Sequence, residues 1–358
     1  MRVAVAMSGG VDSLRAAVLL KEMGCSVTGI HMRLPIPEAE DAVRDGTYTK
    51  REEQLLTLAA EFSIPLTIVD MRRGFEEKVV RPFLEAYQAG RTPNPCIVCN
   101  IEIKFGVLLR EAIEMGMDFL ATGHYARVFP PESSKDRFKL LRGKDTSKDQ
   151  SYFLYGLTQS QLARAVFPLA SRTKVETLAW AKAVGLSSSF REESQEICFI
   201  PDGNYQEFFM RRLQLDPDAQ KGLILDEEGN RLGEHKGVFA YTVGQRRGLG
   251  ISSSAPYYVL AMDPVANVVR VGRQQDLYCR GFHVEKTNWV SIPPPIAALR
   301  GQVRIRNQHL PASATIDPRG ETYAVVTFDK PQRAVTPGQA AVFYDGDLVL
   351  GGGVIRRR

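Results

Sequence analysis

Residues 8–13, with the sequence Ser-Gly-Gly-Val-Asp-Ser, combine groups suited to binding a phosphate. They directly follow an apolar run that predicts a buried strand, and they open a segment with the apolar spacing of a helix. Glycine lets the backbone approach a phosphate closely, and the amides at a helix N-terminus point toward an anion. Ser8 and Ser13 can donate hydroxyl hydrogen bonds, and Asp12 can hold Mg²⁺ against the phosphates. No Gly-Lys-Ser/Thr follows, so the segment is neither a Walker sequence nor a dinucleotide fingerprint.

Three of the five cysteines form a second candidate for chemistry. Cys96 and Cys99 lie in the segment 92–100, Thr-Pro-Asn-Pro-Cys-Ile-Val-Cys-Asn, and Cys198 lies far downstream. The two prolines predict that the Cys-x-x-Cys thiols lie on a fixed loop rather than inside an apolar face. One Cys-x-x-Cys is weak evidence for zinc, because a structural zinc site normally has four ligands. A structural zinc pair and loop cysteines without a function both stay open as interpretations.

The elements around these motifs alternate between strands and helices. Strands are predicted at 2–7, 26–32, 65–70 and 119–122, and helices at 12–23, 50–62, 75–89, 102–115 and 173–184. Such alternation predicts a parallel sheet covered on both faces, with ligands bound beyond the C-terminal ends of the strands. Residues 8–13 follow one of these ends, so we expect an N-terminal α/β domain that binds a nucleotide.

The C-terminal part of the sequence has a different pattern and a different charge. After a predicted helix at 205–213, short β-type runs at 257–262, 268–271, 302–306, 323–328 and 340–344 predict a small barrel or sandwich. Residues 273–358 contain 12 Lys/Arg against 7 Asp/Glu, whereas the rest of the chain contains 34 of each. The entire net charge of +5 therefore lies in this quarter, where it would steer an anionic partner; an ordinary solvated basic surface is the alternative.

Length and composition exclude several classes of protein. A chain of 358 residues with 44% hydrophobic and 24% charged residues is typical of a folded, multidomain protein. No apolar run approaches the roughly 20 residues of a membrane span, and the apolar core at the N-terminus is too short for a signal peptide. An odd number of cysteines without an export signal argues against a disulfide framework. We therefore expect a cytoplasmic protein that has no membrane partner.

Further segments of the sequence resemble one family, the bacterial tRNA-specific 2-thiouridylases of the ATP pyrophosphatase superfamily. Besides residues 8–13 and 92–100, they are 121–125, 148–154, 243–250, 336–340 and 350–353. The resemblance runs nearly from end to end. It implies an adenine nucleotide alpha hydrolase-like α/β parallel-sheet domain over 1–203, a small β-rich central domain over 204–273 and a tRNA-binding C-terminal β-barrel over 274–358.

The resemblance also implies a reaction in which ATP activates the wobble uridine of tRNA. The C2 oxygen of uracil is a poor leaving group, so it would first attack the α-phosphate of ATP, and sulfur would then displace AMP. The resemblance assigns Cys99 as nucleophile and Cys198 as carrier of a persulfide from a sulfur-relay donor protein, and the two cysteines end as a disulfide. The nucleotide-binding positions that it implies are Ala6, Met7, Ser8, Gly9, Gly10, Val11, Asp12, Ser13, Met32 and Gly123.

Cys96 departs from the commonest pattern of this family, which has aspartate at that position. A carboxylate near the target base is therefore missing, and a third thiol is present. Cys96, Cys99 and Cys198 could ligate three irons of a [4Fe–4S] cluster, leaving the fourth iron to hold an activated hydrosulfide. We favour the persulfide scheme and keep the cluster scheme as its alternative.

The resemblance places the contacts with tRNA in both the first and the last domain. The implied residues are Asn94, Pro95, Cys96, His124, Lys148, Asp149, Gln150, Arg306, Asn307 and Gln339. The last three lie in the basic C-terminal quarter, and the target uridine must leave its stack to react. Two other functions stay open: an ATP pyrophosphatase ligase that adenylates a small molecule, and a non-catalytic, metal-containing RNA-binding protein.

Overall fold

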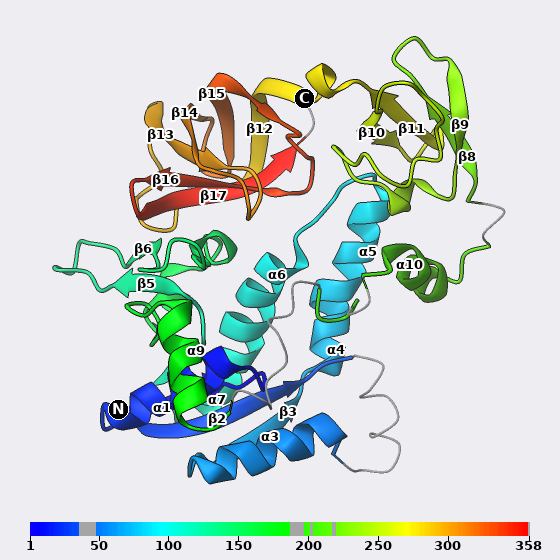
Figure 1. The fold of residues 1–358 in the computed structure, drawn as a ribbon. Helices are drawn as coiled ribbons and strands as arrows, with labels where there is room; N and C mark the ends of the chain where they lie inside the picture. Colours follow the sequence, from blue (N-terminus) through cyan, green and yellow to red (C-terminus); the bar gives the residue numbers. More distant parts are fainter. Residues whose placement is uncertain (36–47, 187–196, 201–202, 217–219, 357–358) are drawn as a thin grey trace.

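The computed structural model describes residues 1–35, 48–186, 197–200, 203–216 and 220–356. Figure 1 shows an α/β region that carries the N-terminus, with two separate β-rich regions on one side of it. The predicted fold class is confirmed, because a parallel-sheet α/β domain is followed by a small β-rich domain and a closed β-barrel. Within the described ranges, no helix is both long enough and apolar enough to cross a membrane.

Five parallel strands form the N-terminal sheet in the order β3-β2-β1-β4-β7. They are β1 (Arg2–Ala6), β2 (Ser26–Arg33), β3 (Leu66–Asp70), β4 (Phe119–Ala121) and β7 (Ala165–Val166). Successive residues of a strand face opposite layers. Val3 and Val5 accordingly pack with α1 (Val11–Glu22), α3 (Lys50–Glu61) and α9 (Lys174–Ala183), whereas Ala4 packs with α7 (Leu109–Glu114) on the other face. Helices therefore cover both faces of the sheet, as the alternating sequence pattern predicts.

Two long helical runs contain π-helical stretches. The first consists of α4 (Arg72–Phe75), η1 (Glu76–Val80) and α5 (Arg81–Gln88), and the second of α6 (Pro95–Val98), η2 (Cys99–Leu108) and α7. The second run shows that the predicted loop position of the Cys-x-x-Cys thiols is wrong: both cysteines lie in the first turns of a helix. Asn94 is the N-cap, because its Oδ1 accepts hydrogen bonds from the amides of Cys96 and Ile97 at 3.2 and 3.4 Å. Pro95 occupies the first helical position, where a missing N–H costs nothing, so it begins this helix.

The central β-rich region contains a four-stranded sheet in the order β10-β11-β8-β9. The strands are β8 (Gly222–Leu225), β9 (Arg231–His235), β10 (Tyr258–Asp263) and β11 (Val268–Gly272), accompanied by α10 (Tyr205–Leu213), η4 (Val238–Ala240) and η5 (Gln274–Leu277). Helix α10 connects this region to the α/β domain through aromatic packing. Phe209 stacks on Phe83 of α5 with ring centroids 5.8 Å apart.

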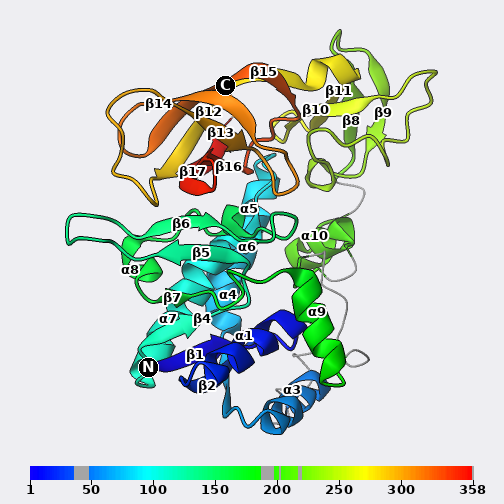
Figure 2. The same ribbon diagram turned by 60° about the vertical axis from the view of Figure 1, so that its left-hand side comes forward.

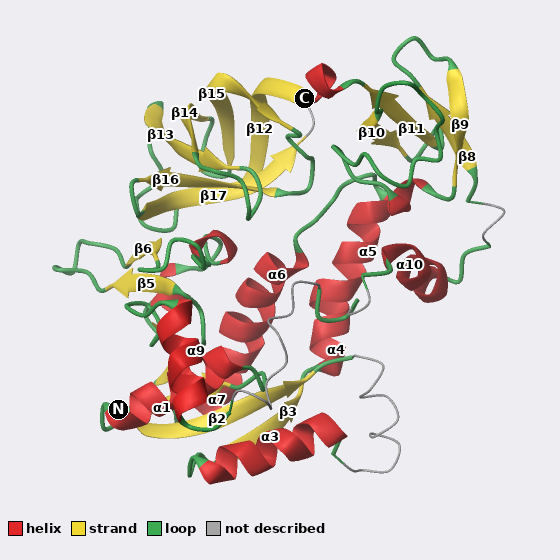
Figure 3. Cartoon of the chain, viewed as in Figure 1, coloured by secondary structure: helices red, strands yellow, loops and turns green. Residues whose placement is uncertain are grey.

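Six strands close into the C-terminal barrel in the order β12-β15-β14-β13-β16-β17, and pairing of β12 with β17 completes it. They are β12 (Tyr278–Asn288), β13 (Leu299–Arg304), β14 (Ala312–Pro318), β15 (Tyr323–Arg333), β16 (Ala340–Asp345) and β17 (Leu348–Arg356). Phe328 and Phe343 are fully buried inside it. Figure 3 shows that the helices gather around the N-terminal sheet, whereas the barrel wall consists of strands.

A hairpin of the α/β domain extends the sheet of the barrel. It consists of β5 (Ala126–Phe129) and β6 (Lys139–Arg142). Strand β6 pairs with β17 at Leu141 and Leu348, and the Arg142 amide donates to the carbonyl oxygen of Asp347 at 2.9 Å. Figure 2 shows the hairpin lying beside the barrel. The two domains therefore share a continuous hydrogen-bonded sheet, which the sequence patterns did not predict.

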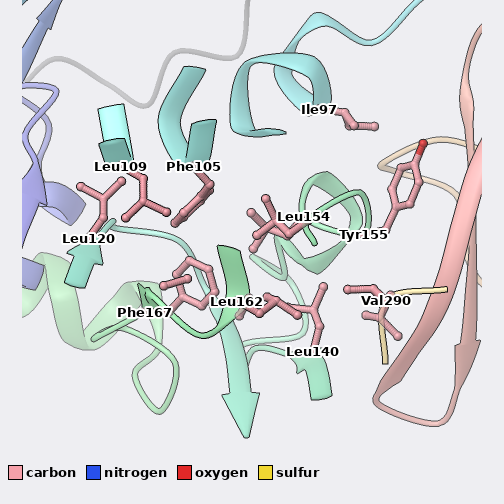
Figure 4. Packing of buried hydrophobic residues seen from close by; sticks show 14 of the residues in the cluster. Ile97, Phe105, Leu109, Leu120, Leu140, Leu154, Tyr155, Leu162, Phe167 and Val290 are labelled. Atoms are coloured by element: carbon pink, nitrogen blue, oxygen red, sulfur yellow. The ribbon is translucent and has the colours of Figure 1, made fainter. Parts of the chain in front are cut away.

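A hydrophobic cluster fills the space between the second helical run, the hairpin and the barrel. Figure 4 shows Phe105 of η2, Leu140 of β6, Leu162 of α8 (Gln159–Leu162) and Val290 of the barrel segment. All four belong to one buried cluster, which also contains Leu154 just after η3 (Ser151–Phe153). The helix that carries Cys99 is thus packed against elements that contact the barrel.

Candidate active site

A cavity of about 400 Å³ lies beyond the C-terminal ends of β1, β2 and β4. It brings together segments that are remote in sequence. Of the predicted site residues, it is lined by Ala6, Met7, Ser8, Asp12, Ser13, Met32, Pro95, Cys96, Cys99, Gly123, His124, Gln150 and Cys198. Phosphate-loop residues and all three candidate thiols therefore face the same space.

The loop between β1 and α1 leaves backbone amides available to an anion. Gly9 has φ +84°, a conformation that L side chains rarely adopt. The Ser13 hydroxyl donates to the carbonyl oxygen of Gly10 at 2.9 Å, and the Ser8 amide donates to Ser13 Oγ at 3.2 Å. Gly10 is the N-cap of α1 and provides no side-chain cap for the first amides of the helix. This arrangement is suited to a phosphate at the helix N-terminus.

Gly123 lets the end of β4 lie directly against this loop. A Cβ atom at this position would lie 2.8 Å from the Asp12 carbonyl carbon and 2.9 Å from the Ser13 amide nitrogen. Only glycine fits there without moving the backbone. The sequence therefore needs glycine at residue 123 to close the nucleotide crevice.

Asp12 is already paired within the protein. Its Oδ2 lies 2.6 Å from Lys174 Nζ of α9, and its Oδ1 accepts a hydrogen bond from the Tyr125 hydroxyl at 2.9 Å. Because the ammonium group compensates the carboxylate charge, the predicted Mg²⁺ ligand does not fit this arrangement. No step below is assigned to Mg²⁺.

The three candidate thiols differ in exposure and share a raised pKa. Cys96 and Cys198 are exposed and Cys99 is half-buried; all are free thiols. Burial raises the pKa of the Cys99 thiol to about 11. Desolvation by the surrounding protein, with added repulsion from Cys99 and Cys96, raises the pKa of Cys198 to about 12. The three thiols line the same cavity, and their raised pKa values keep them protonated at neutral pH.

The described residues contain no group of three or more His, Cys, Asp or Glu side chains placed to hold a metal ion. Cys96, Cys99 and Cys198 line one cavity but do not form such a group around a single ion. The cluster scheme stays a prediction, and no step below uses it.

His124 and Gln150 lie on the side of the cavity formed by β4. Nδ1 of His124 lies 2.6 Å from Thr122 Oγ1, and the ring is packed between Phe105 and Phe167. Burial, together with the positive charge of Lys104, holds the pKa of His124 well below its usual range. His124 is therefore neutral and can exchange hydrogen bonds without adding charge.

The remaining predicted tRNA contacts lie outside the cavity. Asp149 is buried: its Oδ2 accepts from Arg304 Nη1 at 2.9 Å and its Oδ1 from the Ser151 amide at 3.0 Å. Its carboxylate thus connects two domains. Both of its oxygens accept hydrogen bonds from groups within the protein. Asn307 accepts a hydrogen bond from Arg304 through its backbone oxygen.

Arg306, Lys148 and Gln339 also lie outside the cavity lining. Arg306 is half-buried, and its Nη1 donates to the carbonyl oxygen of Arg333 at 3.1 Å. Lys148 is half-buried in the turn after Asp145. Gln339 Nε2 donates to the carbonyl oxygen of Thr92 at 2.9 Å, two residues before Asn94, the N-cap of the thiol helix (α6 and η2, which carry Cys96 and Cys99).

Several charged residues at the site are not predicted by the sequence motifs. Arg51 donates from Nη2 to the carbonyl oxygen of Ser8 at 3.0 Å, and Arg33 forms a bidentate pair with Glu52. Lys104 lines the cavity beside the thiols. Lys104 stands five residues after Cys99 in the sequence; the α-helical period does not place residues with that spacing on one face.

Comparison with known proteins agrees with this architecture. Residues 1–202 match the tRNA methyl transferase HUP domain, 208–273 the tRNA methyl transferase PRC-barrel domain, and 279–355 the aminomethyltransferase beta-barrel domain. Fold and cavity thus define a three-domain protein in which a HUP-type nucleotide domain carries the thiols and two β domains follow it.

Curated relatives then identify the family. A tRNA-specific 2-thiouridylase MnmA of Caldanaerobacter subterraneus is 45% identical over 360 residues, covering 100% of this chain and 98% of the relative. A tRNA-specific 2-thiouridylase MnmA of Syntrophotalea carbinolica is 46% identical, and the match covers 98% of this chain and 97% of the relative. A solved 4-thiouridine synthetase–RNA complex with bound ATP is 18% identical, has a TM-score of 0.33 and covers 60% of this chain and 50% of its own. The chain belongs to the family of tRNA-specific 2-thiouridylases.

Proposed function

We propose that this chain is a tRNA-uridine 2-sulfurtransferase that uses ATP to replace the C2 oxygen of the wobble uridine with sulfur, and that it acts in the cytoplasm. One observation carries the proposal: a single cavity is lined both by the phosphate-binding loop and by Cys96, Cys99 and Cys198. A ligase for small acceptors would not require remote thiols at its nucleotide loop, and a non-catalytic RNA-binding protein would not require that loop.

The first step is activation of the base. The C2 oxygen attacks the α-phosphate of ATP, the bond to the β-phosphate breaks, and pyrophosphate leaves. Ser8, Ser13 and the first amides of α1 hold the phosphates of ATP, and Gly123 lets the segment after β4 pack directly against this loop at the edge of the cavity. Met32 lies at the end of β2, where a parallel sheet binds its ligand.

The second step is sulfur transfer. The terminal sulfur of a Cys198 persulfide attacks C2, and the C2–oxygen bond breaks, so AMP departs with the oxygen and its electron pair. Cys99 loses its proton to solvent, and its thiolate attacks the Cys198 sulfur, which releases the sulfur to the base and forms a Cys99–Cys198 disulfide. A thiol reductant restores both cysteines. Cys198 is exposed, which supports delivery of its sulfur by a donor protein.

The division of labour among the three domains is also part of the proposal. Residues 1–203 would perform the chemistry, and residues 274–358 would bind tRNA through Arg306, Asn307 and the net positive charge of the barrel region. Asn94, Cys96, His124 and Gln150 would contact the extruded uridine, and 204–273 would connect the two.

Pyrophosphate release with and without tRNA tests the proposal. We expect release that requires both ATP and tRNA, and thiolated tRNA only when a sulfide source is added. Release with small acceptors alone would favour the ligase, and no release under any condition would favour the non-catalytic protein.

Cysteine variants test the assignment of roles. Cys99→Ala and Cys198→Ala should abolish thiolation and keep ATP binding, whereas Cys279→Ala, whose Sγ lies 3.0 Å from the Gly281 carbonyl oxygen far from the cavity, should keep full activity. Full activity of either cavity variant would refute the assignment. Cys96→Ser should be tolerated in the persulfide scheme and inactivating in the cluster scheme.

A further inference from the structure

Lys104 is a half-buried lysine whose side chain lines the cavity beside the thiols. Among the described residues, no hydrogen bond or ion pair engages its ammonium group. The other cationic side chains of the lining are committed: Arg33 to the Glu52 carboxylate and Arg51 to the Ser8 carbonyl oxygen. A cation that faces a cavity without a carboxylate partner is suited to an anionic ligand.

We propose that Lys104 binds the α-phosphate of the adenylated substrate at the thiol end of the cavity, and that Gln161 positions Lys104 by holding the π-helical geometry of η2. This inference rests on the proposed function and adds to it a phosphate-binding residue outside the nucleotide loop.

The position of Lys104 follows from the geometry of its helix. Residues Cys99–Leu108 form a π-helix, in which hydrogen bonds connect residues five apart. Cys99 and Lys104 are therefore about one turn apart and lie on the same side. In an α-helix, with 3.6 residues per turn, residues five apart would differ by about 140° in direction. The π-helical stretch thus brings Cys99 and Lys104 closer together in direction than an α-helix would.

Gln161 of α8 binds the carbonyl groups of this stretch. Its Nε2 donates to the carbonyl oxygens of Ile101 and Phe105, both at 3.0 Å, while its Oε1 accepts from the Thr158 amide at 2.9 Å. Gly106 accommodates the same geometry, because a Cβ atom there would lie 2.9 Å from the Ile101 carbonyl oxygen. Side-chain donors that satisfy irregular carbonyl groups stabilise a local departure from the α-helix.

Lys104 lines the same cavity as the thiols and as His124, which belong to the two halves of the site. Its positive charge acts on the thiols of Cys96, Cys99 and Cys198 and on the ring of His124 at the end of β4. His124 itself is neutral, so it cannot supply positive charge. In the proposed reaction the substrate phosphate must lie between the nucleotide loop and the attacking sulfur, which is the region that Lys104 faces.

The chemistry of AMP departure gives this lysine a role. In the adenylated base the α-phosphate is a diester with one negative charge. When the C2–oxygen bond breaks, the electron pair stays on the oxygen and the departing AMP phosphate carries a second charge. An ammonium group already in place stabilises that charge as it develops, without any proton transfer.

Equilibrium binding of AMP and of adenosine to the full chain tests the proposal without requiring turnover. Lys104→Met should weaken AMP binding about tenfold or more, the effect of a lost charge-assisted hydrogen bond, and leave adenosine binding unchanged. Lys104→Arg should retain AMP binding within about threefold. The matched control is Lys78→Met, because Lys78 pairs with Glu102 at 2.7 Å outside the cavity lining; it should change neither ligand.

Gln161→Leu tests the positioning role. This substitution should weaken the binding of AMP but not the binding of adenosine, although residue 161 does not line the cavity. Equal weakening of AMP and adenosine in the Lys104 or Gln161 variants would show a general structural role and overturn the inference, as would unchanged AMP binding in Lys104→Met. If the wild-type chain binds neither AMP nor ATP, the proposed function fails instead, which separates the two failures.

Discussion

Arg304 of the barrel and Asp149 of the α/β domain form a buried ion pair, with Arg304 Nη1 2.9 Å from Asp149 Oδ2 and side-chain exposures of 11% and 2%. Asp149 Oδ1 also accepts hydrogen bonds from the amides of Gly143 and Ser151. The pair therefore joins the two domains at the point where the hairpin β5–β6 meets the barrel.

Breaking this pair should destabilise the protein. Asp149→Ala leaves the guanidinium buried without its partner, so we expect a loss of about 3–5 kcal/mol, measured by urea unfolding. The control is Asp329→Ala, which removes an exposed partner of Arg300 and should cost at most about 1 kcal/mol. Equal losses in the two variants would show that the buried pair does not connect the domains energetically.

Adding a methyl group at Gly123 should displace the phosphate-binding loop. In Gly123→Ala the new Cβ would lie 2.8 Å from the Asp12 carbonyl carbon, so the loop must shift. We expect the loss of most ATP binding, measured by calorimetry, with an unchanged circular dichroism spectrum. Gly74→Ala, where a Cβ meets no atom within 4 Å, should bind ATP normally. Normal ATP affinity in Gly123→Ala would place the nucleotide elsewhere.

Reactivity of the cavity thiols should rise steeply with pH. Because the pKa values of Cys99 and Cys198 are raised to about 11 and about 12, the reactive thiolate is a minor form at neutral pH. Alkylation by iodoacetamide, followed by mass spectrometry, should therefore accelerate about tenfold per pH unit between pH 7 and 10. In urea both cysteines should react faster at pH 8, since an unfolded thiol titrates near about 8.5. A plateau near pH 7 in the folded protein would contradict the raised values.

The ion pair between Arg33 and Glu52 should make the free energy of unfolding depend on pH in the acidic range. Burial alone would raise the pKa of Glu52, but hydrogen bonds from Arg33 and the Thr49 amide lower it below its model-peptide value of 4.5. A folded-state pKa below the unfolded one gives stability that is present above about pH 4.5 and is lost as the pH falls through the folded value. The difference in unfolding free energy between wild type and Glu52→Gln should thus be constant from pH 8 to 6 and shrink below about pH 4.5. A difference at pH 3 that is as large as the difference at pH 7 would contradict this linkage.

Local sequence patterns predicted most elements of the α/β domain because the strands are apolar and the helices have clear caps. Thr49 with Glu52 and Thr173 with Glu176 form the capping boxes that begin α3 and α9. The two prolines before the cysteines predict a loop, whereas in the structure Asn94 and Pro95 begin the helix that carries the thiols. Asparagine followed by proline is found both in loops and at the start of helices. Only the backbone structure shows that a helix begins here.

Long-range features could not be predicted from one sequence. Strand β6 has four residues, and its partner β17 lies more than two hundred residues later, so no local pattern signals their pairing. The sequence alone assigns no role to Lys104, because helical periodicity assumes 3.6 residues per turn and η2 does not follow it. The convergence of Cys99 and Cys198 on one cavity likewise depends on tertiary packing.

The turn at 336–339 supports the segment that leads into the thiol helix. The Thr92 amide donates to the Pro337 carbonyl oxygen at 2.9 Å, and Gln339 Nε2 returns a bond to the Thr92 carbonyl oxygen at 2.9 Å. A chimaera that takes its barrel from a relative would consequently exchange the residues that support Thr92 together with the net positive charge of the C-terminal quarter. Such hybrids should stay competent only when the donor barrel supplies the same backbone carbonyl and amide side chain opposite residue 92.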